Sequence, residues 1–205
     1  MKLVDTREVV KALIPKYAKG LTLDVGGGTS KYRDIIDSYV DKYLVSDLYP
    51  LDGVDYVEDA RKLGHKDKTF DTILSFQLLE HVDDTKAVVT EIYRVLKNGG
   101  IAIVTTPFLG AEHGHPSDFH RFTTEGLSWY FKEAGFKTLE LGKQGSTLAV
   151  CAELLRFKFL NPYKKHGRIK TSIMTRIVKF LKKLDKSGIL NNDSFYSNVY
   201  IVAQK

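Results

Sequence analysis

Residues 21–30 read LTLDVGGGTS, an apolar run that ends in a carboxylate and three consecutive glycines. The segment before the glycines, 21–25, has the composition of a buried parallel strand. The glycines at 26–28 predict a turn without side chains, where a ligand can approach the backbone closely. The residues that follow, 31–39, can form a short helix whose first amides face the same space. Together these features indicate a nucleotide-type site.

The carboxylate at the end of this strand, Asp24, restricts the kind of nucleotide. Lys31 occupies the position of the third glycine of a dinucleotide-binding G-x-G-x-x-G fingerprint. A carboxylate beside the turn would also repel a pyrophosphate at short range. S-adenosylmethionine (SAM) carries a sulfonium and an ammonium group, so Asp24 favours this ligand. Asp47 ends the next apolar stretch and can accept hydrogen bonds from two ribose hydroxyls. Asp59 lies where a third strand would end, and can meet the adenine edge.

Further motifs follow in a fixed order along the chain. They are DVGGG at 24–28, Asp47, Asp59-Ala60, FDTILSF at 70–76, LEHV at 79–82 and LKNGG at 96–100. This ordered set resembles the class I SAM-dependent methyltransferases of the methyltransferase type 11 group. Ser30 replaces the last glycine of the usual D-x-G-x-G-x-G loop. The resemblance implies SAM as the cofactor, bound by Asp24, Gly26, Gly27, Gly28, Asp47, Leu48, Asp59, Ala60, Ser75 and Phe76.

The predicted elements form one α/β domain. Strands are predicted at 21–25, 42–46, 54–57, 70–75, 101–105, 136–141 and 195–202, and helices at 4–18, 85–96 and 124–134. We expect Pro15 to bend or interrupt the first helix. Alternating strands and helices predict a parallel sheet with right-handed crossovers. The resemblance implies a Rossmann-like, seven-stranded, mostly parallel sheet whose last strand is antiparallel and lies between the fifth and sixth. Residues 1–205 are expected to form a single domain, with a basic helical insertion at about 145–190 before the last strand.

The composition indicates a globular protein that can bury a proper core. The chain has 205 residues, of which 43% are hydrophobic. The start of the chain lacks a secretion signal, and no apolar run is long enough to span a bilayer. Cys151 is the only cysteine and lies in an apolar run, which predicts a packed thiol. The expected compartment is the cytoplasm.

The positive charge of the chain is concentrated in one segment. Residues 156–186 hold eleven Lys or Arg and one acid, a net charge of +10, while the remainder carries −4. Apolar residues recur at helical spacing on one side of this segment and cations on the other; they are Met174, Ile177, Val178, Leu181 and Leu184 against Arg176, Lys179, Lys182, Lys183 and Lys186. Three interpretations remain: packing on the domain with a solvated basic face, peripheral contact with an anionic membrane at its inner face, and, less favoured, nucleic-acid binding.

A dense polar loop follows the strand at 101–105. Residues 113–122 read HGHPSDFHRF, and in this architecture they should overhang the methyl group. We expect His115 or His120 to be the catalytic base, Asp118 to orient an imidazole and Arg121 to bind an anionic group; His81 is a further candidate. Two alternatives remain: a solvated loop with local pairing of Asp118 and Arg121, and a metal site formed by the loop histidines and Asp118.

The loop pattern H-P-x-D-F-x-R-F-T resembles a subgroup of bacterial and archaeal methyltransferases that is associated with cell-surface glycan pathways. This similarity covers most of the chain and is weakest at 145–190. The leading hypothesis is a SAM-dependent methyltransferase acting on a small-molecule or glycan acceptor, at an oxygen. The alternatives are an RNA or protein methyltransferase that docks through the basic insertion, and a non-catalytic SAM-binding regulatory module. No metal site is assigned.

Overall fold

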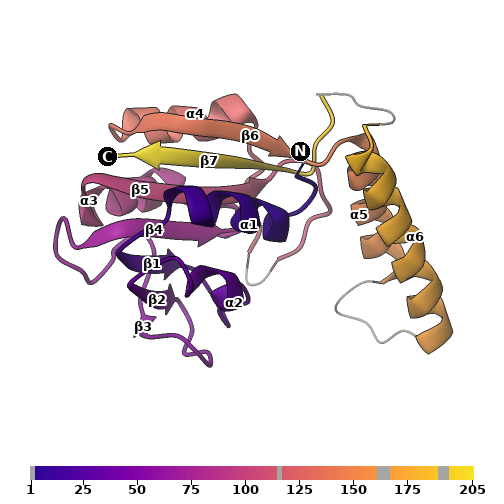
Figure 1. Ribbon diagram of the computed structural model, residues 1–205, viewed down its shortest axis with the longest axis horizontal. Coiled ribbons are helices and arrows are strands. Elements are labelled where there is room, and N and C mark those ends of the chain that lie inside the picture. Colours follow the sequence, from indigo (N-terminus) through magenta and orange to yellow (C-terminus); the bar gives the residue numbers. More distant parts are fainter. Residues whose placement is uncertain (1–2, 115–116, 161–166, 189–193) are drawn as a thin grey trace.

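The computed structural model describes residues 3–114, 117–160, 167–188 and 194–205. Its centre is a seven-stranded sheet in the order β3-β2-β1-β4-β5-β7-β6 (Figure 1). The strands are β1 (Leu21–Val25), β2 (Lys42–Asp47), β3 (Tyr56–Val57), β4 (Phe70–Phe76), β5 (Leu96–Pro107), β6 (Lys137–Gln144) and β7 (Asn198–Gln204). Strands β1 to β5 pair in parallel, and β7 pairs antiparallel with both β5 and β6. The predicted Rossmann-like fold, with its antiparallel last strand between the fifth and sixth, is confirmed.

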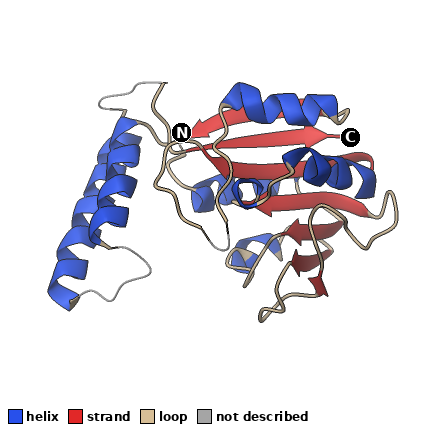
Figure 2. Cartoon of the chain, turned by 180° about the vertical axis from the view of Figure 1, so that it is seen from behind, coloured by secondary structure: helices blue, strands red, loops and turns tan. Residues whose placement is uncertain are grey.

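Helices cover both faces of the sheet (Figures 1 and 2). They are α1 (Thr6–Tyr17), α2 (Arg33–Ile36), the 3₁₀ turn η1 (Leu79–His81), α3 (Thr85–Val95), α4 (Thr124–Glu133), α5 (Thr147–Phe159) and α6 (Arg168–Lys186). One buried apolar cluster packs α3 and α4 against the sheet, and a second packs α1 and α2 against its other face. This two-sided cover explains why the central strands are apolar on both faces.

Several element boundaries differ from the predictions: the last strand, expected at 195–202, is Asn198–Gln204, and three further differences change the elements themselves. The predicted helix at 31–39 is only the four residues of α2. Helix α1 runs through Pro15 to Tyr17, so the predicted break is absent; Pro15 lies in the last turn, where little helix remains to be disturbed. Helix α3 ends at Val95 and β5 begins at once, because residues 97–100 form a bulge within the strand instead of a separate loop.

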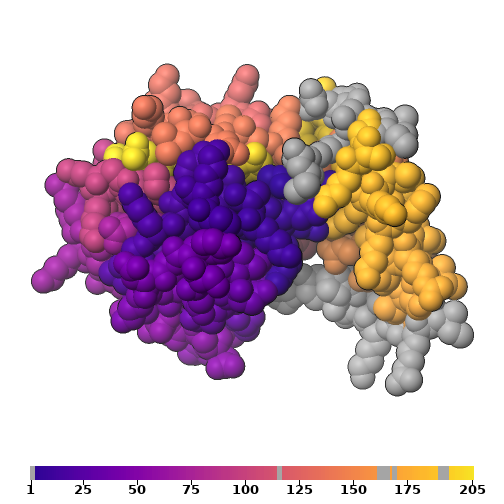
Figure 3. Space-filling view, in the orientation of Figure 1, coloured from indigo at the N-terminus to yellow at the C-terminus, as the bar shows by residue number. Residues whose placement is uncertain are grey.

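Helices α5 and α6 form a hairpin beside the sheet, which we call the arm (residues 147–186) (Figures 1 and 3). The arm is inserted between β6 and β7, where the backbone N–H of Ser197 donates to the carbonyl of Gln144 at 2.9 Å. Asp185, near the end of α6, is fully buried at the start of α5. Its carboxylate accepts hydrogen bonds from Ser146 N, Ser146 Oγ and Ala149 N, at 3.0, 2.6 and 3.1 Å. The only acid of the basic segment therefore joins the two helices of the arm.

Side chains of the arm correct two sequence interpretations. Cys151 is exposed rather than packed, because its apolar run forms a helix that buries Ala149, Val150 and Ala152 and turns position 151 outward. Lys182 pairs with Glu153 of α5 at 2.7 Å, and Lys186 pairs with Glu8 of α1, so neither lies on a purely solvated face. In the described parts of the chain, no helix has the length and apolar character required to cross a membrane.

Candidate functional site

The glycine turn leads from β1 towards α2 and leaves no room for a side chain at Gly26 or Gly27. The amides of Gly26 and Gly27 donate to the Ser46 carbonyl at 2.8 and 3.2 Å. Gly26 has φ +70°, and a Cβ placed there would lie 2.6 Å from Cδ1 of Leu78. At Gly28 (φ +54°) a Cβ would meet nothing within 4 Å. The turn therefore needs glycine at 26 for space, and at 28 only for its backbone conformation.

Asp47, at the end of β2, fixes the far side of this turn. Its Oδ2 accepts from the amide of Gly28 at 3.0 Å, and its Oδ1 accepts from the amide of Tyr49 at 3.1 Å. Each carboxylate oxygen has a second lone pair, so Asp47 can still accept two further hydrogen bonds. This geometry suits the predicted ribose contact.

Asp24 lies beneath the turn, shielded from solvent. It is only 2% exposed, and its Oδ2 accepts a 2.6 Å hydrogen bond from the hydroxyl of Tyr43. Its Oδ1 has no hydrogen-bond partner among the described residues. Burial raises the pKa of Asp24 to about 6. The sequence indicated the charge but gave no sign of Tyr43 as its partner, because this pairing depends on the register of β1 and β2.

A cavity of about 600 Å³, which we call the larger cavity, opens beside the turn. This volume is typical of small-molecule sites. Its predicted lining residues are Gly26, Asp47, Leu48, Asp59, Ala60 and His81. The other predicted cofactor residues do not line it: Asp24, Gly27, Gly28, Ser75 and Phe76. Ser75 and Phe76 are buried in β4, and the next two residues, Gln77 and Leu78, take their place. Gln77 has φ +59°, an unusual conformation for a residue with a side chain.

Asp59 has a partner that the sequence did not predict. Arg61 binds both carboxylate oxygens of Asp59, at 2.6 to 3.1 Å, and also pairs with Asp83 at 2.7 Å. These hydrogen bonds hold the pKa of Asp59 below its usual value. All three residues line the larger cavity, so Arg61 competes with an adenine edge for Asp59.

A second cavity of about 370 Å³, the arm cavity, lies between the domain and the arm. Its walls come from the start of α1, from the segment after β5, and from the facing sides of α5 and α6; they include Arg7, Tyr32, Pro107, Leu109, His113, Glu153, Arg156, Phe157 and Lys182. Gln77 lines this cavity as well as the larger one. The two cavities therefore adjoin at the carboxyl end of β4, where ligands bind in open α/β sheets.

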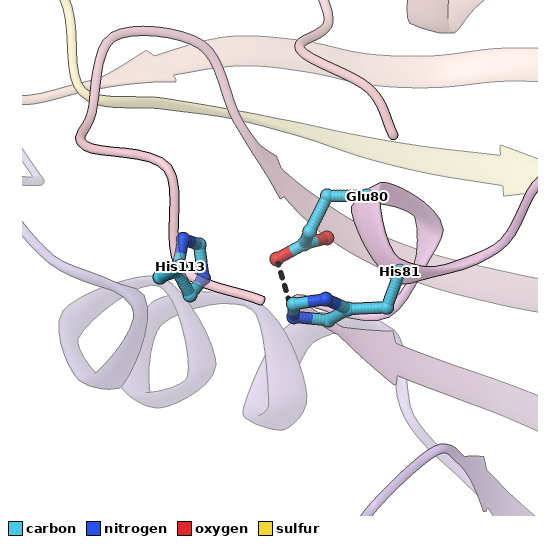
Figure 4. Close-up of side chains that lie close together, drawn as sticks. All are labelled: Glu80, His81 and His113. Carbon is cyan, nitrogen blue, oxygen red and sulfur yellow. Dashed lines mark ion pairs between the residues drawn. The ribbon is translucent and has the colours of Figure 1, made fainter. Parts of the chain in front are cut away.

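Three polar side chains lie at this junction: Glu80, His81 and His113 (Figure 4). His81 lines the larger cavity and His113 lines the arm cavity. Glu80 is fully buried, its Oε1 lies 3.8 Å from Nε2 of His81, and burial raises its pKa to about 7. His81 was a candidate from the sequence. Glu80 and His113 stood in the quoted motifs, but no pattern showed that a turn and a distant loop would bring them together.

The predicted catalytic loop is arranged differently from the expectation. Asp118 orients His113 by accepting from its backbone N–H at 2.8 Å, and does not orient His120. Arg121 binds both oxygens of Asp118 and lowers the pKa of that carboxyl to about 2, so its guanidinium holds the loop and is not free for an anionic group. Local pairing of Asp118 and Arg121, the alternative interpretation, is what the structure shows.

Of the two histidines predicted to be the catalytic base, His115 and His120, only His120 can be placed in the described part of the structure. His120 approaches the carbonyl of Asp83 at 3.4 Å and lines neither cavity, so its predicted role has no support from the geometry. The backbone amides of Phe119 and His120 bond to the carbonyl of Glu80, at 2.7 and 3.4 Å, which fixes this part of the loop. His115 lies outside the described residues.

Comparisons with known proteins agree with this site. Residues 23–104 match the family described as "Methyltransferase domain". The ubiquinone/menaquinone biosynthesis C-methyltransferase UbiE of Desulfotalea psychrophila is 47% identical over 58 residues, which are 27% of this chain and 24% of that protein. The chloroplastic 2-methyl-6-phytyl-1,4-hydroquinone methyltransferase 1 of Oryza sativa subsp. japonica is 32% identical over 155 residues, covering 63% of this chain and 45% of that protein. The chain thus spans less than half the length of these two curated relatives.

Solved structures share the fold over nearly the whole chain. The [4+2]-cyclase SpnF superposes with a TM-score of 0.65 at 21% identity, covering 97% of this chain and 80% of that one. Phosphoethanolamine N-methyltransferase 2 of Haemonchus contortus, solved with SAM, gives a TM-score of 0.60 at 19% identity, covering 96% of this chain and 51% of that one. The protein therefore has the fold of the class I SAM-dependent methyltransferases, and residues 23–104 match the methyltransferase family model. The resemblance predicted from the sequence is confirmed.

The residues of the larger cavity fit SAM, the cofactor of this class. The glycine turn lets a ligand reach the backbone, and Asp47 retains free lone pairs for a diol. Asp24 supplies a buried carboxylate oxygen without a hydrogen-bond partner beneath the turn, which suits a cationic ligand. Leu48, Ala60 and Leu78 give the cavity apolar walls.

Proposed function

We propose that the protein is a methyltransferase that transfers a methyl group from SAM, held in the larger cavity, to a small molecule held in the arm cavity. The observation that carries this proposal is the shared wall: Gln77 lines both cavities, and Glu80, His81 and His113 lie at the same boundary. Two reactants held in adjoining cavities need little further ordering before they react.

The chain's own residues have distinct tasks in this reaction. SAM supplies a methyl group on a cationic sulfur. Asp47 and the glycine turn bind the cofactor, and the charge of Asp24 favours its positive groups across the backbone of the turn. A hydroxyl acceptor must lose its proton for methyl transfer, and the junction residues are the polar groups placed to promote this loss. They replace His120 as the proposed activating groups.

The walls of the arm cavity indicate the class of acceptor. Tyr32, Pro107, Leu109 and Phe157 provide apolar and aromatic surface. The cations of these walls are paired with acids, Arg7 with Asp34, and Arg156 and Lys182 with Glu153. The apolar and aromatic surface suits a hydroxylated ring better than a glycan. The hydroquinone named for the rice relative and the quinones named for the bacterial one support a ring acceptor. We propose the ring hydroxyl oxygen as the methylated atom.

The arm also presents a surface suited to an anionic membrane. Ile173, Ile177 and Phe180 follow helical spacing on α6 and are exposed by 54%, 39% and 59%. The exposed cations Arg176, Lys179 and Lys183 lie among them. We propose that this face rests on anionic lipids, because apolar side chains among cations bind such surfaces. A peripheral position at the inner membrane face would bring lipid-soluble ring acceptors to the arm cavity.

A methyl-transfer assay with radiolabelled SAM tests the function. The acceptors compared are short-chain hydroquinones, anionic phenols, neutral sugars and total RNA. Transfer to a phenol or hydroquinone supports the proposal, and mass spectrometry of the product distinguishes an O-methyl from a C-methyl group. Transfer to RNA and to no small molecule would contradict the proposal and favour the alternative, an RNA methyltransferase that docks through the basic insertion. Tight SAM binding without turnover on any acceptor would favour the non-catalytic module, since a fold does not by itself determine an activity.

A further inference from the structure

The junction residues have the composition and placement of a metal site. Glu80, His81 and His113 each offer one ligand atom, and these atoms all lie within 4.8 Å of one another (Figure 4). The three residues come from the η1 turn and from the loop after β5, so the chain brings them together across more than thirty positions. This cluster differs from the histidine-loop metal site considered from the sequence, because among the described residues it combines His113 of that loop with Glu80 and His81 of the η1 turn.

A buried acceptor without a partner points into this cluster. Glu80 is 0% exposed, and its Oε1 has no hydrogen-bond partner among the described residues. Its other oxygen, Oε2, accepts a long hydrogen bond from the hydroxyl of Thr106, at 3.5 Å. A buried carboxylate oxygen without a hydrogen-bond partner destabilises the folded protein unless a cation compensates its charge. Nε2 of His81 lies 3.8 Å from Oε1, which is too far for a hydrogen bond.

Both histidines are oriented as metal-binding histidines are. Nδ1 of His81 donates to the carbonyl of Ser117 at 2.6 Å, which leaves Nε2 as the lone-pair nitrogen facing Glu80. Nδ1 of His113 lies 3.2 Å from the carbonyl of Ala111 and 3.5 Å from Oδ2 of Asp118. A ligating imidazole usually donates its other N–H to a carbonyl or carboxylate in this manner. Arg121, which binds Asp118, secures the second of these supports.

We propose that Glu80, His81 and His113 bind one divalent transition-metal ion at the junction of the two cavities. Two imidazoles and one carboxylate favour Zn²⁺, Fe²⁺, Co²⁺ or Mn²⁺ over Mg²⁺ and Ca²⁺, which prefer oxygen ligands. Three protein ligands leave at least one coordination position open. Ligands of a common ion lie about 3.4 Å apart, so the cluster must contract slightly from its present spacing.

The position of the site gives the metal a use. Because His113 lines the arm cavity, the open position faces the acceptor, and an oxygen bound to such an ion loses its proton more readily. Metal binding itself does not depend on the identity of the acceptor. It is therefore measured separately from methyl transfer.

Spectroscopic titration with Co²⁺ tests the site. The full chain is stripped with a chelator, and Co²⁺ is added while the visible absorption is recorded; competition with Zn²⁺ then gives relative affinities. We expect one equivalent to bind with ligand-field bands of a site containing nitrogen ligands. Glu80→Gln and His113→Gln should each weaken binding by about 100-fold or more. His120→Gln, a change of the same type in the same loop, should leave it within twofold.

Two further measurements keep the result interpretable. Thermal unfolding of each variant without metal shows that it is folded, and SAM calorimetry on His113→Gln should match wild type, because His113 does not line the larger cavity. Absence of a Co²⁺ band in the folded wild-type chain overturns the proposal. Equal binding by wild type and by folded Glu80→Gln and His113→Gln overturns it too, and leaves the methyl-transfer proposal standing on its own assay.

Discussion

The hydroxyl of Tyr43 donates a 2.6 Å hydrogen bond to Oδ2 of Asp24, beneath the glycine turn. The pKa of Asp24 is about 6 in the folded protein, above its ordinary value of 3.8. The folded state therefore binds more protons than the unfolded state between these values, and stability falls as pH rises through this window. The full cost, about 3 kcal/mol, is present above about pH 6. The charge that favours SAM thus destabilises the protein without it.

Asp24→Asn should separate these two effects. We expect the variant to be more stable than wild type by up to about 3 kcal/mol at about pH 7.5, with a smaller advantage at about pH 4.5. We expect its affinity for SAM to fall about tenfold, because the ligand's cations lose their buried counter-charge. Urea unfolding at both pH values and SAM calorimetry measure these changes. Equal affinity for SAM in both proteins would show that Asp24 acts only on the fold.

Gly26→Ala should close the larger cavity, whereas Gly28→Ala should not. Both residues have positive φ, so each substitution costs about 1–2 kcal/mol of backbone strain. Only at Gly26 does the new Cβ also meet Leu78, at 2.6 Å, which adds about 1–3 kcal/mol. We expect calorimetry to show lost SAM binding in Gly26→Ala and near-normal binding in Gly28→Ala. Similar losses in both variants would mean that strain, not space, limits the turn.

Asp47→Ala should weaken SAM binding by at least about tenfold, through loss of the ribose contact. The variant should also lose about 1–2 kcal/mol of stability, because Asp47 accepts hydrogen bonds from two backbone amides that the variant leaves without this partner. Asp52→Ala is the matched control, because Asp52 is a nearby exposed acid and its substitution removes the same charge. If calorimetry gives the same SAM affinity for both variants, the contribution of Asp47 is only long-range charge.

Asp185→Ala should release the arm while leaving the cofactor site intact. Asp185 accepts three hydrogen bonds at the start of α5, so its loss should cost about 2 kcal/mol. We expect faster hydrogen exchange in α5 and α6, unchanged SAM affinity and a raised KM for the acceptor. Asp185→Asn keeps one acceptor oxygen, so its hydrogen exchange and its KM should lie between those of wild type and Asp185→Ala. An unchanged KM in the folded variant would contradict the placement of the acceptor against the arm.

The double variant Ile173→Ser/Phe180→Ser should reduce binding to anionic vesicles at least tenfold, since burial of each large apolar side chain contributes about 1.5–3 kcal/mol. Trp129→Ser is the control, because this exposed aromatic lies on α4, away from the arm. Flotation with anionic and neutral vesicles, at low and high salt, measures the effect. Binding that is insensitive to both salt and the double substitution would exclude the membrane face.

The sequence predicted the sheet well, because strand and helix periodicity are local. Five of the ten residues predicted to bind the cofactor line the larger cavity. The predictions for the catalytic loop were poorer. Side-chain directions there depend on distant contacts, such as the bond from the amide of Phe119 to the carbonyl of Glu80. His115 and His120 were favoured as the base, yet among the described residues of this loop it is His113 that lies with Glu80 and His81. Gln77 lines the larger cavity in place of the predicted Phe76, because β4 ends at Phe76 and the chain turns there.

The arm leaves and rejoins the sheet at one point, where Ser197 bonds to Gln144. Its two ends thus lie side by side, and everything between them can change length or sequence without altering strand register. Most residues of the larger cavity come from the first half of the chain, and one wall of the arm cavity, the proposed acceptor site, comes from the arm. An arm transplanted from a homologue at these two residues should carry a new substrate preference onto an unaltered donor site, which makes the segment a natural unit for recombination and enzyme engineering.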